Sequence, residues 1–409
     1  MNILYINHYA GAPKYGMEFR PYYLSKEWVK RGHNVIMVAS SYSHVRSKNP
    51  DLKNKICVEI IDNIIYIWFK TLKYKGNGLK RVLNILDFIF LLFRYSNDLM
   101  KKYNPDIVIA SSTYPLDIFP AYFISKIKNS KLIFEVHDLW PLTAIEIGGY
   151  SKWHPFIVLM QFAENFAYKN SDYVVSILPN AYEYMKSHGL PYFKYIHIPN
   201  GINLKDWQES NEEAPKMHKE LIENLKMKGK VIIGYLGTHG RANALDILLD
   251  AANLLNEEKN LAIILVGDGP EKEKLIEKTE LYKLKNVYFL PSVSKLAIPQ
   301  IIEMMDALYV GCKNLPLYKY GVSANKIYDY MMSGKPIIQS ISAGNDIVKN
   351  AKCGISVPAE DSRQIAIAIK KLMSMTKEER EILGTNGRNY VLKYHTYEVL
   401  ASRYEKLFY

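Results

Sequence analysis

The chain has 409 residues, 48% of them hydrophobic, which predicts two or three domains with a large core and excludes a disordered chain. Its three cysteines, Cys57, Cys312 and Cys353, lie far apart without zinc or disulfide spacing, which favours a reducing cytosol. The formal net charge of +12 is concentrated in residues 1–199, and because no nucleic-acid-binding motif accompanies it, no nucleic-acid partner is expected.

The first half of the chain alternates short β-branched runs with longer amphipathic segments. It opens with "NILYIN" at 2–7, which lacks a basic n-region and is too short for a signal peptide, so we expect a strand and no export. The following segments of this series span 22–33, 34–40, 106–111, 131–138, 173–178 and 195–200. This alternation is the βαβ pattern of a parallel sheet.

A basic approach precedes an apolar stretch from Val82 to Phe93. The cations of the approach are Lys70, Lys73, Lys75, Lys80 and Arg81. A helix over this stretch reaches about 18 Å, which is too short for a hydrocarbon core of roughly 30 Å. It suits a helix in the membrane interface, attracted to anionic lipid, and predicts a cytoplasmic protein peripheral on the inner face of the membrane. A buried core helix with a solvated basic approach is the alternative.

A polar stretch at 199–220, "PNGINLKDWQESNEEAPKMHKE", predicts a hinge followed by a linker. The βαβ pattern restarts after it, with segments at 231–237, 246–258, 261–269, 271–283, 287–291, 296–310 and 335–341. We therefore expect one domain at 1–199 and a second at 200–390. The last segment, 391–409, is expected to be helical at its end and to pack back on the first domain.

Ligands of open parallel sheets bind beyond the carboxyl ends of the strands, so site residues are sought there. In the loop "NHYAGAPKYGMEFRP", Gly16 would let the backbone approach a phosphate and Arg20 would add a cation at the helix start. An ordinary strand-to-helix turn is at least as compatible with this loop. His137 and Asp138 end another strand, where the histidine could donate to a sugar hydroxyl. A capped turn with a satisfied histidine fits that position equally well.

Two glycine-rich loops follow strands of the second domain. In "GYLGTHGRANALDILLDA", Gly237 would help to form a backbone anion pocket, with Thr238, His239 and Arg241 as side-chain donors. A plain turn is the competing interpretation. In "LVGDGP", Gly267 and Gly269 permit unusual backbone angles and could line a nucleotide base pocket, or the turn could simply be tight.

The stretch "YGVSANKIYDYMMSGKPII" at 320–338 predicts a helix that Ser323 would cap. The helix start, Val322 to Lys326 with Ala324 and Asn325 between them, would then present backbone N–H groups and a cation to a diphosphate. Asp329, one turn further, could accept hydrogen bonds from ribose hydroxyls. An i,i+3 Lys–Asp pair on a solvated face, which stabilises a helix by only a few tenths of a kcal/mol, is the alternative.

A resemblance to a known family is carried by the stretch at 320–338 together with "PNGIN", "VGDGP", "GTHGRANALDILLDAA", "HDLWP" and "KRGHNV". The chain resembles the retaining glycosyltransferase family 4 of the GT-B fold. More narrowly, it is similar to the bacterial branch that builds O-antigen and capsule, including N-acetylfucosamine transferases. The resemblance implies an α/β protein whose two Rossmann-like domains have parallel sheets facing across a central cleft. It also implies a nucleotide-sugar donor held mainly by the C-terminal domain, an acceptor held by the N-terminal one, and no bound metal or cofactor.

Some family positions are matched and others are not. Asp329 matches the second acid of the family's E-x7-E motif, whereas Gly321 stands in place of the first acid. His137 matches the family's cleft histidine, and Gly16 with Arg20 matches the loop that approaches the donor phosphates. The family's Arg and Lys after the first strand of the C-terminal domain are replaced by Thr238 and Asn243, with Arg241 as a substitute. The resemblance thus implies catalytic roles for His137, Lys326 and Arg241.

The expected reaction is retaining transfer of a sugar, such as an N-acetylated amino sugar, from a UDP-linked donor to a polyprenyl-diphosphate-linked saccharide. Two alternatives remain open. A GT-B sugar-nucleotide epimerase would need no acceptor, and a non-catalytic carbohydrate- or lipid-binding relative would fit the missing first acid.

Overall fold

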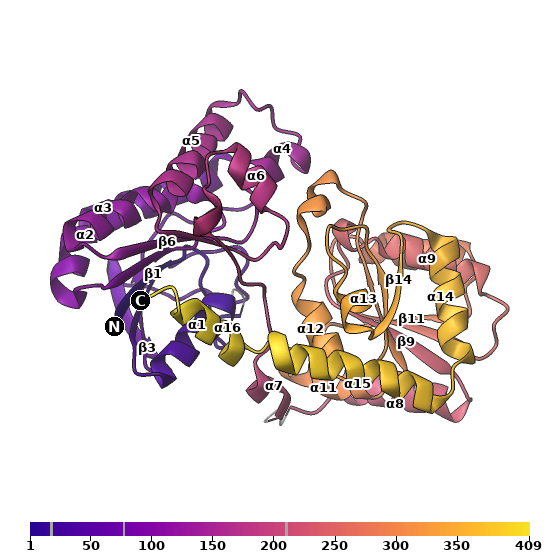
Figure 1. Cartoon of the computed structure of the whole chain (residues 1–409). Coiled ribbons are helices and arrows are strands. Elements are labelled where there is room, and N and C mark those ends of the chain that lie inside the picture. The colour runs from indigo at the N-terminus through magenta and orange to yellow at the C-terminus, as the bar shows by residue number, and fades with distance from the viewer. Residues whose placement is uncertain (17–18, 77, 209–211) are drawn as a thin grey trace. The chain divides into compact units, whose positions relative to one another are not determined.

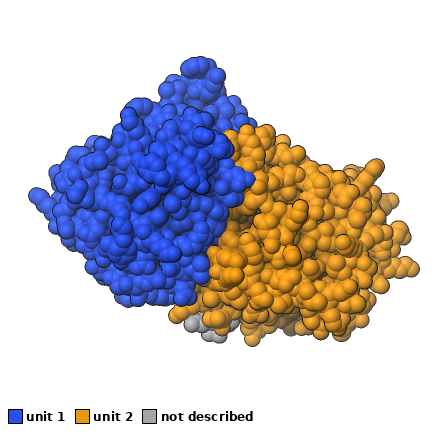
Figure 2. Space-filling model, viewed as in Figure 1, with its two compact units in different colours: residues 1–200, 397–409 blue, residues 201–396 orange. Residues whose placement is uncertain are grey.

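The computed structural model describes residues 1–16, 19–76, 78–208 and 212–409, which form two compact units (Figures 1 and 2). Unit 1 comprises Met1–Asn200 and Tyr397–Tyr409, and unit 2 comprises Gly201–Thr396. The chain thus returns to unit 1 at Tyr397 rather than at 391, because helix α15 (Lys377–Tyr394) continues beyond the expected boundary.

Unit 1 is built on a sheet in the order β3-β4-β2-β1-β5-β6-β7-β8. Its strands are β1 (Asn2–Ile6), β2 (Asn34–Ser40), β3 (Ile56–Ile61), β4 (Ile64–Phe69), β5 (Ile107–Ala110), β6 (Lys131–Val136), β7 (Tyr173–Ser176) and β8 (Tyr195–His197). All neighbouring pairs are parallel except β3 and β4, which form an antiparallel hairpin. The order reverses between β1 and β5.

Helices cover both faces of this sheet (Figure 1). They are α1 (Phe19–Lys30), α2 (Leu79–Tyr103), α3 (Ile118–Lys128), α4 (Leu142–Glu146), α5 (Pro155–Asn170), α6 (Tyr182–Ser187) and α16 (Tyr397–Glu405). Helices α1 and α16 pack against each other and share one core, in which Trp28 contacts Tyr404 and Phe408. Helices α2, α3 and α5 pack side by side on the other face. The final segment of the chain is therefore part of unit 1.

Unit 2 has a fully parallel sheet in the order β11-β10-β9-β12-β13-β14. Its strands are β9 (Val231–Leu236), β10 (Leu261–Val266), β11 (Val287–Leu290), β12 (Ala307–Gly311), β13 (Ile337–Ser340) and β14 (Gly354–Val357). Its helices are α7 (Leu204–Gln208), α8 (Lys216–Met227), α9 (Leu245–Leu254), α10 (Lys272–Leu281), α11 (Ile298–Glu303), α12 (Asn325–Met332), α13 (Ile347–Ala351), α14 (Ser362–Ser374) and α15.

The two faces of this second sheet carry separate cores. Alternate strand residues pack on α9 and α14 on one face and on α8, α11, α12 and α15 on the other. The strand order reverses between β9 and β12. This is the double-wound arrangement of a Rossmann-like domain, so the predicted fold class is confirmed.

Three local predictions differ from the structure. The apolar stretch Val82–Phe93 is only part of α2, which has 25 residues and continues for ten residues beyond Phe93. The stretch predicted as a linker contains α7 and the start of α8, with 209–211 outside the described residues. The β3–β4 hairpin was missed, although Asp62 and Asn63 at its turn have positive φ, a conformation that these residue types tolerate.

Candidate active site

The switch point of the unit 2 sheet brings together two segments predicted for the site, the loop after β9 and the start of α12. Ligands of double-wound sheets bind outside the carboxyl ends of the two strands where the order reverses. Strand β9 ends at Leu236 and leads directly into Gly237 and Thr238, while β12 ends at Gly311. The side chain of Lys326, in the first turn of α12, extends to this edge.

Lys326 is the best-defined cation of this edge. Its Nζ donates to the Tyr235 hydroxyl at 3.0 Å and to Asn243 Oδ1 at 2.7 Å, and it lies 4.6 Å from the centroid of the Tyr235 ring. A Cβ added to Gly237 would lie 3.4 Å from the same Nζ. Burial lowers the pKa of Lys326 to about 8. A lysine held next to a glycine-rich strand end is suited to an oxyanion, which would raise that pKa again.

Gly267 and Gly269 allow the loops after β9 and β10 to lie against each other. Both have φ near +150°, and a Cβ would lie 1.9 Å from the Gly237 carbonyl oxygen at the first and 2.6 Å from the His239 carbonyl oxygen at the second. The His239 amide donates to the Asp268 carbonyl at 2.8 Å. These glycines are therefore required for packing of the loops, and contact with a nucleotide base stays a prediction.

The amino end of α12 differs in detail from the predicted cap. The N-cap residue is Ala324 and no side chain caps the helix, because the Ser323 hydroxyl pairs with the Tyr328 hydroxyl at 2.9 Å instead. The Val322 amide donates to Asn345 Oδ1 at 2.8 Å, and the Asn325 side chain is exposed. Ser323 as the cap was thus wrong, while the helix start itself lies one residue from the expected position.

Asp329 lies on α12 one turn beyond this end. Its Oδ1 accepts a hydrogen bond of 3.3 Å from Trp207 Nε1, on α7. Burial raises its pKa, against the lowering effect of Lys295 and of this hydrogen bond. Gly321, which replaces the first acid of the family motif, has φ +104° and ends the 3-10 turn at Pro316–Tyr320. Ribose binding by Asp329 stays a prediction.

Thr238 and Arg241 are both exposed in the loop that follows β9. The Thr238 carbonyl accepts from the Tyr235 hydroxyl at 2.8 Å and from Asn243 Nδ2 at 2.9 Å, so it is tied to the same cluster as Lys326. Arg241 opens the 3-10 turn Arg241–Asn243, which precedes α9. The loop after β9 therefore offers an exposed hydroxyl and an exposed cation.

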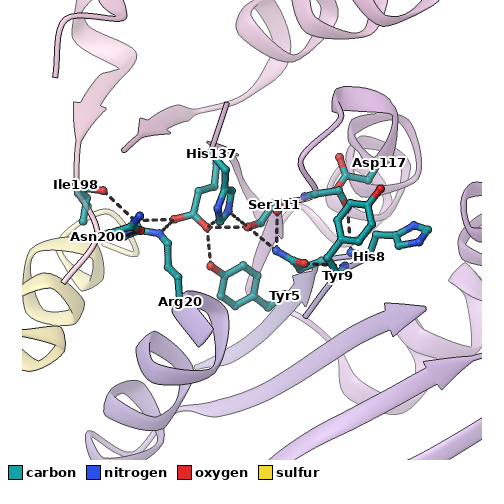
Figure 3. Close-up of polar contacts among 12 residues, drawn as sticks. Tyr5, His8, Tyr9, Arg20, Ser111, Asp117, His137, Ile198 and Asn200 are labelled. Carbon is teal, nitrogen blue, oxygen red and sulfur yellow. Dashed lines mark hydrogen bonds and ion pairs between the residues drawn. The ribbon is translucent and has the colours of Figure 1, made fainter. Parts of the chain in front are cut away.

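In unit 1, a buried polar network forms at the corresponding edge of the sheet (Figure 3). Glu135, on β6, is fully buried and accepts from Tyr5 Oη at 2.6 Å, Ser111 Oγ at 2.7 Å and Arg20 Nη2 at 2.9 Å. Burial would raise the pKa of Glu135, but Arg20, His137 and the hydrogen bonds hold it well below its ordinary value. His137 Nε2 lies 2.9 Å from Ser111 Oγ and 3.4 Å from Glu135 Oε2. The network thus fixes the orientation of the predicted histidine.

Arg20 does not serve as a cation of the loop before α1. It is buried in an ion pair with Glu135 and also donates to the carbonyls of Pro199 at 2.6 Å and Ile198 at 2.9 Å. Its guanidinium therefore ties α1 and β6 to the end of unit 1's main segment (Figure 3). Gly16 has φ +73° and pairs with Ala12 in a one-residue bridge, so the loop is a tight turn at this point.

The whole chain superposes on solved structures of the GT-B type. Sucrose-phosphate synthase of Thermosynechococcus elongatus is 18% identical, with a TM-score of 0.74 over 100% of this chain and 98% of that one. The Anabaena protein HepE, solved with UDP and glucose, is 15% identical, with a TM-score of 0.68 over 99% and 98% of the two chains. These likenesses establish the fold.

Family models match both units. Residues 15–206 match the model described as Glycosyltransferase Family 4, and residues 230–375 match the one described as Glycosyl transferases group 1. Each of the two units is thus similar to a glycosyltransferase domain. Among curated relatives of this chain, the protein of Escherichia coli (strain K12) described as the putative colanic acid biosynthesis glycosyl transferase WcaI is 23% identical over 240 residues, or 56% of each chain. The chain spans about half the length of the curated relatives it matches.

Several residues that contact the candidate site residues were missed by the sequence analysis. Glu135 could have been predicted from its spacing, because residues two apart on a strand share a face and His137 lies two residues after Glu135. Tyr235 lies inside an apolar strand and Trp207 in a stretch interpreted as linker, so neither could have been predicted. Their contacts depend on segments about ninety or more residues away in the sequence.

Proposed function

We propose that this glycosyltransferase moves a sugar from a nucleoside-diphosphate donor, UDP-linked, to a lipid-linked saccharide in surface polysaccharide synthesis, with retained configuration. The observation that carries the proposal is the position of Lys326 Nζ against Gly237 at the switch point of unit 2. A UDP complex of HepE and the colanic acid name of WcaI support the donor class and the pathway class, respectively.

The chemistry requires stabilisation of negative charge on the leaving diphosphate. The bond from the anomeric carbon to the phosphate oxygen breaks, and the acceptor oxygen bonds to the same face of the sugar. The acceptor proton passes to the leaving phosphate, which explains why no pair of catalytic carboxylates is needed. Lys326, the amides at the start of α12 and Arg241 would supply the donors, each contributing roughly 3–4 kcal/mol when preorganised. We propose that these cations act without a bound metal.

The acceptor side of the proposal rests on unit 1. His137, oriented by Ser111 and Glu135, is proposed to face the transferred sugar. Helix α2 presents an outward apolar stripe next to a basic approach, which supports peripheral binding to an anionic bilayer. Among the described residues, the chain contains no helix with the length and hydropathy of a membrane span.

The test is transfer of radiolabelled sugar from UDP-sugars to lipid-linked saccharides, with and without EDTA, followed by NMR of the new anomeric linkage. We expect EDTA-resistant transfer with retention. Inversion would overturn the retaining mechanism, and an epimerised donor formed without acceptor would replace transfer by epimerisation. Absence of UDP binding in calorimetry would point to a non-catalytic relative.

A further inference from the structure

Unit 1 contains an apolar cavity of about 440 Å³ between the amino end of α2 and helices α4 and α5. Its lining residues are Gly78, Leu79, Arg81, Val82, Ile85, Trp140, Thr143, Ala144, Ile147, Gly148, Tyr150, His154, Phe156 and Ile157. Arg81 is the only permanently charged side chain among these described residues. The volume lies within the range of small-molecule sites, about 300–1,000 Å³, and the walls are mainly hydrocarbon.

The cavity lies at the carboxyl edge of the sheet, next to the network that orients His137. Trp140 follows His137 by three residues, in the turn that connects β6 to α4. Arg81 Nη2 donates to the Tyr9 hydroxyl at 3.3 Å, and Tyr9 follows the end of β1, one of the two strands at the switch point. A ligand in the cavity would therefore have one end near the polar end of the unit 1 sheet.

The mouth of the cavity continues into an exposed apolar surface. Leu79 and Ile147 line the cavity and are 73% and 54% exposed, and Trp153 beside it is 78% exposed. From Leu79 the exposed side of α2 continues as Leu83, Leu86, Phe90 and Phe93, all on one helical face. Exposed cations lie close in sequence to these lining residues, namely Lys73, Lys75, Lys80 and Lys152, with Glu146 as an exposed acid on α4.

We propose that this cavity holds the first isoprene units of a polyprenyl-diphosphate acceptor, with the diphosphate next to Arg81. The cavity is suited to one hydrocarbon chain, the exposed stripe leads the rest of that chain toward the bilayer, and the exposed lysines near the lining residues in sequence complement a diphosphate and anionic lipid. This inference rests on the lipid-linked acceptor of the proposed function and adds the site that recognises its lipid part.

The experiment measures binding of geranylgeranyl diphosphate, below its critical micelle concentration, to the full chain by calorimetry. Ile147→Asp places a charge at the mouth, and Ala144→Trp fills the cavity. Ile60→Asp is the matched control, because Ile60 is also an exposed isoleucine of unit 1, 69% exposed on the edge strand β3. Thermal unfolding verifies that each variant is folded. We expect both cavity variants to bind at least tenfold more weakly, with Ile60→Asp unchanged.

Three results would overturn the proposal. The first is equal binding of geranylgeranyl diphosphate by the cavity variants and the control, and the second is an affinity for inorganic diphosphate equal to that for geranylgeranyl diphosphate. The third is equally strong competition by dihexanoylphosphatidic acid, which would indicate a general acyl-chain site. UDP binding is measured on the same samples. If UDP binds but the cavity variants bind geranylgeranyl diphosphate as the control does, only the cavity proposal is refuted. If the native chain does not bind UDP, the proposed transferase is refuted.

Discussion

At the scale of single residues, the proposed diphosphate contact of Lys326 in unit 2 can be tested directly. A charge-assisted hydrogen bond contributes about 1.5–3 kcal/mol, so Lys326→Ala should weaken UDP binding by at least tenfold in calorimetry. Lys319→Ala, an exposed lysine on the preceding 3-10 turn, is the control and should bind normally. Equal binding by the two variants would show that Lys326 does not contact the diphosphate.

The lowered pKa of Lys326 also predicts a pH dependence. With a pKa of about 8 in the free protein, Lys326 loses its proton above that pH, so UDP affinity should fall as pH rises from 8 to 10. In Lys326→Ala, the decrease in UDP affinity that comes from deprotonation of Lys326 should be absent. Over the same range, folding of the free chain should become more favourable, because only the unfolded state still binds that proton. A pH-independent difference between the two proteins would contradict the assignment.

Glu135 is the residue whose charge matters most to unit 1. Glu135→Gln leaves the buried Arg20 without its anion, so we expect a loss of about 3–5 kcal/mol in the free energy of unfolding, measured in urea at pH 7. Because the pKa of Glu135 is held below its ordinary value of 4.5, this stability is present above about pH 4.5 and is lost as pH falls further. Arg20→Met combined with Glu135→Gln should recover part of the loss. A change below 0.5 kcal/mol would make the pair energetically unimportant.

At the scale of elements, α2 is a helix with two apolar sides, one buried in unit 1 and one exposed. If the exposed stripe lies in the membrane interface, Phe90→Asp should reduce sedimentation with phosphatidylglycerol vesicles several-fold, since it inserts a charge where 65% of the phenylalanine is exposed. Leu281→Asp, at an even more exposed position on α10 in unit 2, should sediment as the native chain does. High salt should weaken the native interaction, because the basic approach contributes through screened charge.

At the scale of the whole molecule, the two units have separate sheets and separate switch points, and the donor is assigned to one of them. Hydrogen exchange with and without UDP should therefore show protection in the loops after β9 and β10 and at the start of α12. The buried network of Glu135 and His137 in unit 1 should change little. Protection confined to unit 1 would contradict the assignment of the donor to unit 2.

The sequence by itself determined the fold class, because hydrophobic periodicity is a local property that alternating strands and helices display directly. It also placed Gly237, Lys326 and His137 at strand or helix ends, since those ends are marked by glycines and by changes of period. The β3–β4 hairpin could also have been predicted from local sequence, because Asp62 and Asn63 are residue types that favour a turn, but it was missed.

Only the tertiary structure decided which side chains meet. Tyr235 and Asn243 contact Lys326 because β9 and α12 lie at one edge of the sheet, a proximity that no spacing along the chain encodes. Arg20 was interpreted as a ligand for a phosphate but is paired with Glu135, because packing of α1 on the sheet removes both from water and a buried charge requires a partner. The periodicity of a sequence specifies which face of an element is buried, whereas the identity of the partner on that face depends on how distant segments pack.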